Sequence, residues 1–405
     1  MAVGSPPPID IPPVPGFRLA ATACGLKATG RPDLLLVHMH PGTAVAGVFT
    51  RNQVVAAPVQ ICRQRLVGGR ADALIVNAGN ANAGTGPQGV QNALEVSRSV
   101  ARELSVPEAC IFISSTGVIG QPLPVEKIRA AIPSLAANLR DDAWSDAAVA
   151  ITTTDTFPKA RHRRCTLDGR PVLLAGIAKG AGMIHPDMAT LLAYVFTDAA
   201  ITPMAWQRLL ERAVSASFNS ITVDGDTSTN DTLLGFASGL AGNDLLTDPD
   251  SPRAAPLVTA LNDLCQELAH LIVRDGEGAT KFITITVAGA KSEADARQIG
   301  KVVAHSQLVK TAFFGQDPNW GRILAAVGRA GIPINVDAVD IHLGDVQIVQ
   351  KGGLDPTYTE ARGAQVMSAP EIAVHIHLHA GSAAATTWTC DLSHDYVTIN
   401  ADYRT

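Results

Sequence analysis

A threonine at the junction of a glycine-rich loop and an apolar strand is the residue best placed for covalent chemistry in this sequence. The segment Lys179–Thr190 reads KGAGMIHPDMAT, and the apolar run Leu191–Phe196 follows it directly. A threonine hydroxyl is a poor nucleophile because it holds its proton tightly, and a neighbouring base is one remedy. The α-amino group of Thr190 would be a compact base, since its ordinary pKa of about 8 leaves it partly neutral near physiological pH.

That amine exists only if the peptide bond between Ala189 and Thr190 is cut. Self-cleavage can supply it, because the Thr190 hydroxyl can attack the preceding carbonyl and hydrolysis of the resulting ester frees the amine. An Ala-Thr step before a strand is weak support by itself, because threonine is common in strands for packing reasons. The segment alone therefore also fits a plain strand start.

A second polar pair follows another expected strand. Ser114-Ser-Thr116-Gly117 comes directly after the apolar run Ile111–Ile113. Acyl transfer builds negative charge on a carbonyl oxygen, and losing one fixed donor to that oxygen can cost about 3 kcal/mol or more. A Thr-Gly pair at a strand end can present a hydroxyl and a close backbone N–H, although a plain strand-to-helix turn would have the same residues.

Strands and helices that alternate along the chain must position these groups. Bounded apolar runs predict buried strands, amphipathic stretches predict helices, and Asp168-Gly169 is a plausible hairpin turn. We expect strands at 44–49, 73–76, 111–114, 191–196 and 281–288, a hairpin over 166–178, and helices near 90–104, 125–138, 203–217, 254–273 and 294–311. We expect a turn at 317–322, and short strands between 333 and 399 with turns at Gly344-Asp345 and Gly352-Gly353.

Length and composition indicate a globular α/β protein with more than one domain. The chain has 405 residues, a length that suggests two or three domains. Hydrophobic residues make up 46% and aromatic residues only 4%, which favours tightly packed α/β layers over an all-β sandwich. We expect a flexible proline-rich arm at 1–16, a catalytic core at 17–285 and a C-terminal α+β domain at 286–405.

Charge and cysteine usage argue against several classes of protein. A net charge of −5 argues against a nucleic-acid binder, and the basic cluster Arg161–Arg164 is expected to be solvated surface. No apolar stretch approaches the roughly 18 residues of a membrane span, and Met1–Phe17 does not resemble a secretory signal. The six cysteines form no C-x-x-C pair, which favours free thiols in a reducing compartment, so we expect a cytoplasmic protein.

Cofactor and calcium signatures are missing or incomplete. No G-x-G-x-x-G follows a strand and no G-x-x-x-x-G-K-[ST] occurs, while the glycine-rich segment 79–84 lacks the middle glycine of a phosphate cradle. Asp224-Gly-Asp226 starts like a calcium loop. Thr229 stands at its glycine position and Gly235 at its glutamate position, so the sharp turn and the bidentate ligand are both missing.

Three alternating histidines could in principle ligate a metal. His375, His377 and His379 fall two residues apart on an expected strand, so their side chains share one face. No carboxylate or cysteine nearby in the sequence completes a site. We therefore interpret the histidines as a surface or interface face and expect no metal.

In their order along the chain, these motifs resemble those of the ornithine acetyltransferase family, also called glutamate N-acetyltransferase. The segment Lys179–Leu192 resembles the family's cleavage and nucleophile motif. Further segments resemble the family at Gly47–Asn52, Ser115–Gly120, Thr153–Asp155, Ser228–Thr232, Glu277–Lys281, Leu308–Thr311, Asp317–Arg322 and Asn400 to Arg404-Thr405. The family often has small or hydroxyl residues where this chain has His185-Pro186-Asp187, and we interpret His185 as lining the loop rather than assisting cleavage.

The resemblance implies a fold, an assembly and a set of site residues. The fold would be a layered αββα sandwich related to self-cleaving N-terminal-nucleophile aminopeptidases, plus a smaller α+β C-terminal domain whose last residues return to the active site. Cleavage between Ala189 and Thr190 would give an α and a β chain, assembled as an α2β2 heterotetramer. The acetyl group would ride on Thr190, with Thr116 and Gly117 forming the oxyanion hole. The residues implied to hold the substrate are Thr153, Lys179, Thr190, Glu277, Asn400 and Thr405.

The activity implied is acetyl transfer from N2-acetyl-L-ornithine to L-glutamate in arginine biosynthesis, by a ping-pong cycle that needs no cofactor. Acetyl-CoA stays open as a further acetyl donor. Lys179 could orient a substrate carboxylate and Glu277 could pair with a substrate ammonium, although from sequence alone such residues are more often surface charges. Two alternatives remain: a related self-cleaving amidohydrolase or aminopeptidase that lets water reach the acyl-enzyme, and an unprocessed binding protein.

Overall fold

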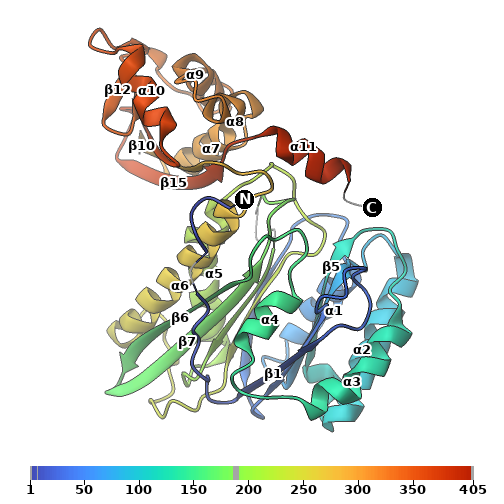
Figure 1. Ribbon diagram of the computed structural model, residues 1–405. Coiled ribbons are helices and arrows are strands. Elements are labelled where there is room, and N and C mark those ends of the chain that lie inside the picture. The colour runs from blue at the N-terminus through green and yellow to red at the C-terminus, as the bar shows by residue number, and fades with distance from the viewer. Residues whose placement is uncertain (1, 7, 186–190, 403–405) are drawn as a thin grey trace.

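Two stacked sheets form the centre of the larger part of the computed structural model, which describes residues 2–6, 8–185 and 191–402 (Figure 1). The first sheet has the order β1-β2-β4-β5, and the second has the order β3-β9-β8-β7-β6. The strands are β1 (Phe17–Thr22), β2 (Leu34–Met39), β3 (Ala44–Phe49), β4 (Ala73–Asn80), β5 (Ile111–Val118), β6 (Lys159–Leu167), β7 (Arg170–Lys179), β8 (Leu192–Thr197) and β9 (Thr232–Ala237). Pairing is parallel between β4 and β5 and between β8 and β9, and otherwise antiparallel.

Helices cover the outer face of each sheet. The first sheet packs against α2 (Gly86–Leu104) and α3 (Val125–Ala137), and the second packs against α5 (Pro203–Ala216) and α6 (Ala255–Arg274). At the edges, α1 (Ala57–Leu66) contacts β3 and β5, and α4 (Trp144–Ala150) contacts β1 and β7. The four layers are visible in Figure 1 and confirm the expected αββα sandwich.

The core between the two sheets is aromatic at its centre. The ring centroid of Phe196 lies 5.2 Å from those of Phe17 and Trp144 and 5.4 Å from that of Phe236. Such ring pairs add about 0.5–1.5 kcal/mol each beyond the burial of their area. Alternate residues of β8 face this core and the layer of α5 and α6, which explains why the strand is apolar at nearly every position.

The C-terminal part folds around a third sheet with the order β13-β12-β11-β14-β10-β15. Its strands are β10 (Phe282–Ala290), β11 (Asp340–Leu343), β12 (Val346–Gln350), β13 (Gly353–Leu354), β14 (Glu371–His377) and β15 (Ala383–Cys390). It shares one apolar core with α7 (Glu293–Ala304), α8 (Gln307–Phe314), α9 (Trp320–Gly328) and α10 (Glu360–Ser368). The last helix, α11 (His394–Ala401), leaves this part and reaches back toward the sandwich (Figure 1).

Two features of the chain's organisation differ from the expected boundaries. All of β10 belongs to the third sheet, so a boundary at 285–286 would cut a strand, and we place it before Phe282. The proline-rich arm contacts the body at several points. The Val3 amide donates to the Arg274 carbonyl at 2.8 Å, and the Val14 side chain is buried.

Three predicted elements in the C-terminal part were wrong. The helix expected over 294–311 is two helices, because the chain turns at His305 and Ser306 takes an extended conformation ahead of α8. The end of the expected turn at 317–322 is helical instead, since the Asn319 side chain accepts from the Arg322 amide at 3.1 Å and caps α9. In the range 333–399, where we expected short strands, residues 360–368 form α10, and α11 begins at His394 and has no buried residue.

Two predictions of exposed surface have different outcomes, since the basic cluster is partly buried whereas the histidines lie on an exposed face. Arg161 is buried rather than solvated, because α6 packs across β6 and its Glu267 forms ion pairs with Arg161, at 2.6 Å, and with Arg163. His375 and His377 lie on the exposed face of β14, and His379 follows the strand with its Nε2 2.8 Å from Asp340 Oδ2.

Within the described ranges, no group of three or more side chains is arranged to hold a metal, and no helix is long and apolar enough to cross a membrane.

Candidate active site

A cavity of about 280 Å³ opens where the ends of β5 and β7 meet the turn after α6 and the helix α11. It is lined by six residues that the sequence predicted as site residues, namely Thr116, Gly117, Thr153, Lys179, Glu277 and Asn400. They come from segments that are far apart in the sequence. The structure therefore brings together in one wall every predicted site residue that it describes.

The strand end at Thr116-Gly117 has a backbone that only glycine fits. Gly117 has a φ of +132°, and a Cβ added there would lie 2.3 Å from the carbonyl carbon of Gly79. The side chain of Asn230 supports this end by donating to the carbonyl oxygens of Ser115 at 2.8 Å and Ala81 at 2.6 Å. The segment 79–84, considered above as a phosphate cradle, thus packs against β5.

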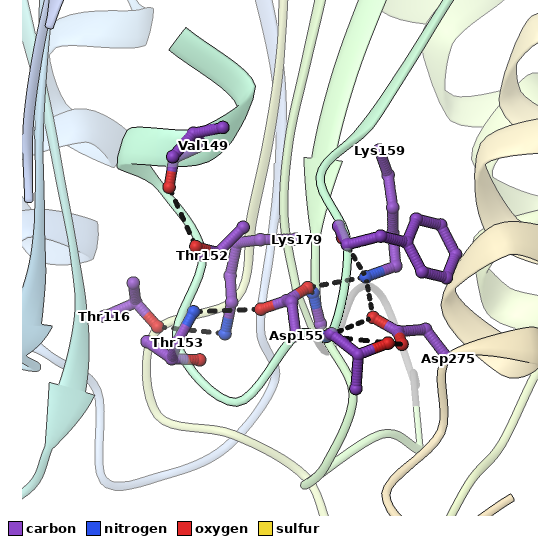
Figure 2. Close-up of polar contacts among 11 residues, drawn as sticks. Thr116, Val149, Thr152, Thr153, Asp155, Lys159, Lys179 and Asp275 are labelled. Atoms are coloured by element: carbon purple, nitrogen blue, oxygen red, sulfur yellow. Dashed lines mark hydrogen bonds and ion pairs between the residues drawn. The ribbon is translucent and has the colours of Figure 1, made fainter. Parts of the chain in front are cut away.

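The Thr116 hydroxyl faces the cavity beside Lys179. Lys179 Nζ donates to Thr116 Oγ1 at 3.2 Å, so the hydroxyl accepts from a cation and keeps its own hydrogen for another acceptor (Figure 2). A hydroxyl polarised in this way is a stronger donor, because hydrogen bonds in a chain strengthen one another at low local dielectric. This is the arrangement that a developing oxyanion needs.

Lys179 is a buried cation, contrary to the surface position that its residue type suggests. It is the last residue of β7 and is 8% exposed. Burial lowers the pKa of its ammonium group, and the carboxylate of Asp155 opposes that effect. Among the described residues it forms no ion pair, and its hydrogen bond is to the neutral Thr116 hydroxyl.

Glu277 is a buried anion in the same wall. It is 7% exposed, and its Oε2 accepts from Asn400 Nδ2 at 2.8 Å, which attaches α11 to the cavity. Gly182 permits its position, because a Cβ there would lie 2.3 Å from Glu277 Oε2. Glu277 also forms no ion pair with any residue that the structure describes, so within those residues the cavity wall presents a lysine and a glutamate that both lack an ion-pair partner.

Thr153 is held at the cavity by its neighbour Asp155. The Thr153 amide donates to Asp155 Oδ2 at 2.9 Å, and the Gly180 amide donates to Asp155 Oδ1 at 2.7 Å. Figure 2 shows Asp155 between Lys179 on one side and the buried pair of Lys159 and Asp275 on the other. One carboxylate thus connects the Thr153 loop to the end of β7.

Three predicted residues, Ala189, Thr190 and Thr405, lie outside the described residues. Leu191, the next residue after Thr190 in the chain, lines the cavity, and its carbonyl accepts from the Thr232 amide at 2.9 Å. His185 Nδ1 lies 3.1 Å from the Thr222 hydroxyl, and the imidazole ring packs against His305.

Asp231 is a cavity residue that the sequence did not single out. It is 2% exposed, and its Oδ2 has no hydrogen-bond partner among the described residues. Burial raises the pKa of this carboxyl well above its usual range. Asp231 does lie inside the segment Ser228–Thr232, which resembles the family. The resemblance gave no role to individual residues of that segment.

Comparisons with known proteins identify the family of this chain. The model of the ArgJ family matches residues 18–405. This chain belongs to the ArgJ family. Curated relatives are the arginine biosynthesis bifunctional proteins ArgJ of Methylococcus capsulatus, 52% identical over 98% of this chain and 97% of that protein, and of Gluconobacter oxydans, 48% identical over 98% and 93%.

The solved structure of the ArgJ protein of Bacillus halodurans is 41% identical, with a TM-score of 0.50. The match covers 51% of this chain and 97% of that one. ArgJ membership confirms the resemblance drawn from the motifs, and with it the expectation of an enzyme rather than a binding protein.

Proposed function

We propose that this ArgJ chain cleaves itself between Ala189 and Thr190 and then moves an acetyl group from N2-acetyl-L-ornithine to L-glutamate through acetyl-Thr190. The products are L-ornithine and N-acetyl-L-glutamate. The observation that carries the proposal is the pair of buried charges, Lys179 and Glu277, that face one cavity without an ion-pair partner among the described residues.

A buried charge without a partner is costly, and such charges persist where a ligand completes them. A free amino acid carries a carboxylate and an ammonium on the same small molecule, which complements a wall with one cation and one anion. Lys179 fits the α-carboxylate, which ornithine and glutamate share, and Glu277 fits an ammonium group. The family supports the same substrates, since its curated relatives are named for arginine biosynthesis.

The proposed reaction begins with the Thr190 hydroxyl attacking the acetyl carbonyl of N-acetylornithine while its own α-amine takes the proton. The Thr116 hydroxyl and the Gly117 backbone N–H stabilise the oxyanion. The C–N bond breaks, the proton passes to the departing amine, and ornithine leaves. The amine of glutamate then attacks the ester carbonyl, the C–O bond to Thr190 breaks, and the hydroxyl regains its proton.

Self-cleavage and assembly are part of the proposal. The solved Bacillus chain is matched over 97% of its length yet corresponds to 51% of this chain, the size expected when one precursor gives two pieces of similar length. We propose an α2β2 heterotetramer in the cytoplasm, where the free state of all six cysteines fits reducing conditions. The cycle uses no cofactor, and acetyl-CoA enters only as a further acetyl donor, to be tested by CoA release.

The test is acetyl transfer by purified Thr190→Ala and Thr190→Ser proteins. The proposal requires that Thr190→Ala stays a single chain and releases no ornithine, whereas Thr190→Ser retains some cleavage and transfer because serine offers the same groups. Ornithine release by Thr190→Ala at the rate of the unmodified protein would overturn it. Release of free acetate that does not depend on glutamate would favour the amidohydrolase alternative instead.

A further inference from the structure

Lys159 is a buried lysine that none of the roles above uses. It is the first residue of β6, and its side chain is fully buried. Its Nζ lies 2.7 Å from Asp155 Oδ1 and 2.6 Å from Asp275 Oδ2, and both carboxylate side chains are also fully buried (Figure 2). We call Asp155, Lys159 and Asp275 the Lys159 network.

A buried network of this kind needs an explanation other than stability. Well-packed apolar residues of similar volume are often as stabilising as a buried ion pair, or more so, because the charges lose their hydration. The charges are then retained for what they position. Here the two carboxylates of the network hold backbone segments that reach the cavity.

Asp155 holds two segments that reach the cavity. It accepts from the amide of Thr153, which lines the cavity, and from the amide of Gly180, which follows the cavity residue Lys179. Burial alone would raise the pKa of Asp155, but the ammonium groups of Lys159 and Lys179 hold it well below its usual range. The carboxylate therefore stays charged, and its bonds to both amides are charge-assisted.

Asp275 holds the third segment. It follows the last residue of α6 and stands two residues before Glu277. Its carboxylate accepts from the amide of Thr156 at 3.0 Å and from the Thr156 hydroxyl, while Lys159 donates to it from the other side. The turn that carries Glu277 is thereby fastened to the loop that carries Thr153.

We propose that Lys159 is a positioning residue of the ArgJ cavity, which acts through Asp155 and Asp275 to fix the Thr153 loop, the end of β7 and the Glu277 turn relative to one another. The proposal rests on the proposed function for the identity of the amino-acid ligands. The three segments carry the neutral, cationic and anionic groups of the wall. Loosening the network should therefore weaken the binding of both substrates.

The experiment compares Asp155→Asn with Arg161→Met. Asp155→Asn keeps the size of the side chain but removes its charge, and one oxygen becomes a donor that cannot accept from an amide. Arg161 is a matched control, because it lies on the same strand as Lys159, and its buried side chain forms an ion pair with Glu267 of α6 outside the cavity lining. Asp275→Asn is the second variant, for use if Asp155→Asn fails to fold.

Steady-state kinetics and amide hydrogen exchange are the two readouts. We expect Asp155→Asn to raise KM for N-acetylornithine and glutamate about tenfold, the loss expected for a misplaced charged contact. We expect exchange at the Thr153 and Gly180 amides to speed up, because their acceptor is lost. Arg161→Met should lower the unfolding midpoint but leave both KM values and both amides within twofold of the unmodified protein.

A folded Asp155→Asn protein with unchanged KM values and unchanged exchange at these amides would overturn the positioning role, since the network would then act as Arg161 and Glu267 do. The hydrogen-exchange measurement needs no substrate. It therefore separates a failure of this inference from a failure of the proposed acetyl transfer, which would show as unmodified protein that releases no ornithine.

Discussion

Lys159 and Lys179 lie on the neighbouring strands β6 and β7, and both are buried, yet they face different regions. Lys159 pairs in register with Ala178, whose side chain belongs to the core shared with α5 and α6. Lys179 pairs in register with Leu192, whose side chain belongs to the core between the two sheets. Lys159 forms ion pairs with two carboxylates, whereas Lys179 has a hydroxyl as its hydrogen-bond partner.

This difference indicates that Lys159 holds structural segments in place, whereas Lys179 is placed to bind a ligand. Removing one member of a satisfied buried pair leaves the other charge uncompensated, which is strongly destabilising. Removing Lys179 breaks no ion pair among the described residues, and Asp155 keeps its direct contact with Lys159, so the main loss should be a binding contact. Variants of Lys159 should therefore lose stability together with substrate binding, whereas variants of Lys179 should lose substrate binding with little change in stability.

The largest expected effect is on the stability of Lys159→Met. It leaves Asp155 and Asp275 without the ammonium group that bridges them, so we expect the free energy of unfolding to fall by about 3–5 kcal/mol. Denaturant unfolding followed by circular dichroism measures this loss. A midpoint equal to that of the unmodified protein would show that folding does not need the Lys159 ammonium to compensate the carboxylates of Asp155 and Asp275.

Lys179→Met should lose activity without losing stability. We expect kcat/KM for N-acetylornithine to fall about 100-fold, because the substrate carboxylate and the Thr116 hydroxyl both lose a cationic donor. Burial lowers the pKa of the Lys179 ammonium group and the Asp155 carboxylate opposes that effect, so the unfolding midpoint should change little. A large drop in midpoint with near-normal turnover would make Lys179 a structural residue like Lys159.

Glu277→Gln sharpens the same contrast on the anionic side of the cavity. Glutamine can still accept from Asn400 but no longer attracts an ammonium group, so we expect kcat/KM to fall about 10-fold to 100-fold. The defect should be smaller for an N-acetylornithine analogue that lacks the side-chain amine. Equal defects with both substrates would mean that Glu277 does not bind that amine.

The smallest expected effect is a change in how the stability of the protein depends on pH. Two buried carboxyls, Asp155 and Asp231, have pKa values shifted in opposite directions. The pKa of Asp155 is lowered in the folded protein, so its contribution to stability is present above about pH 4 and is lost as the pH falls. The pKa of Asp231 is raised, so its ionisation opposes folding as the pH rises above about 4.

Asp231→Asn should therefore raise the unfolding midpoint slightly at neutral pH and have little effect in acid, whereas Asp155→Asn should lower the midpoint at neutral pH. Unfolding curves recorded at several pH values test this. A neutral-pH midpoint that falls for Asp231→Asn would contradict the assignment of Asp231 as a carboxyl that is disfavoured in its charged form.

The sequence predicted the cavity better than the residues behind it. Gly117 could be found because it lies at a strand end where backbone geometry restricts the residue type. Lys179 was found only through the family resemblance, since its residue type alone suggested a surface charge. Lys159 and Asp275 could not, because a buried lysine looks like a surface lysine in sequence and its partner is 116 residues away. The contact between α6 and Arg161 could not be predicted for the same reason, since Glu267 and Arg161 are 106 residues apart in the sequence.

Element boundaries show a similar limit. The β8 segment was recognisable from its apolar run, but β9 was not predicted. The break at His305-Ser306 and the helical state of α11 depend on backbone choices that periodicity does not encode. Helix α11 has no buried residue, so its sequence carries no apolar stripe to read. Its docking depends on a side-chain contact between Asn400 and Glu277 instead.

Intact-mass spectrometry of the purified protein, mixed with N-acetylornithine and quenched in acid, tests the central claim most directly. We predict two pieces that meet at residues 189 and 190, with the piece that begins at Thr190 heavier by one acetyl group. Addition of glutamate should remove that acetyl group. Active protein that transfers acetyl groups with the bond between residues 189 and 190 intact would contradict the account.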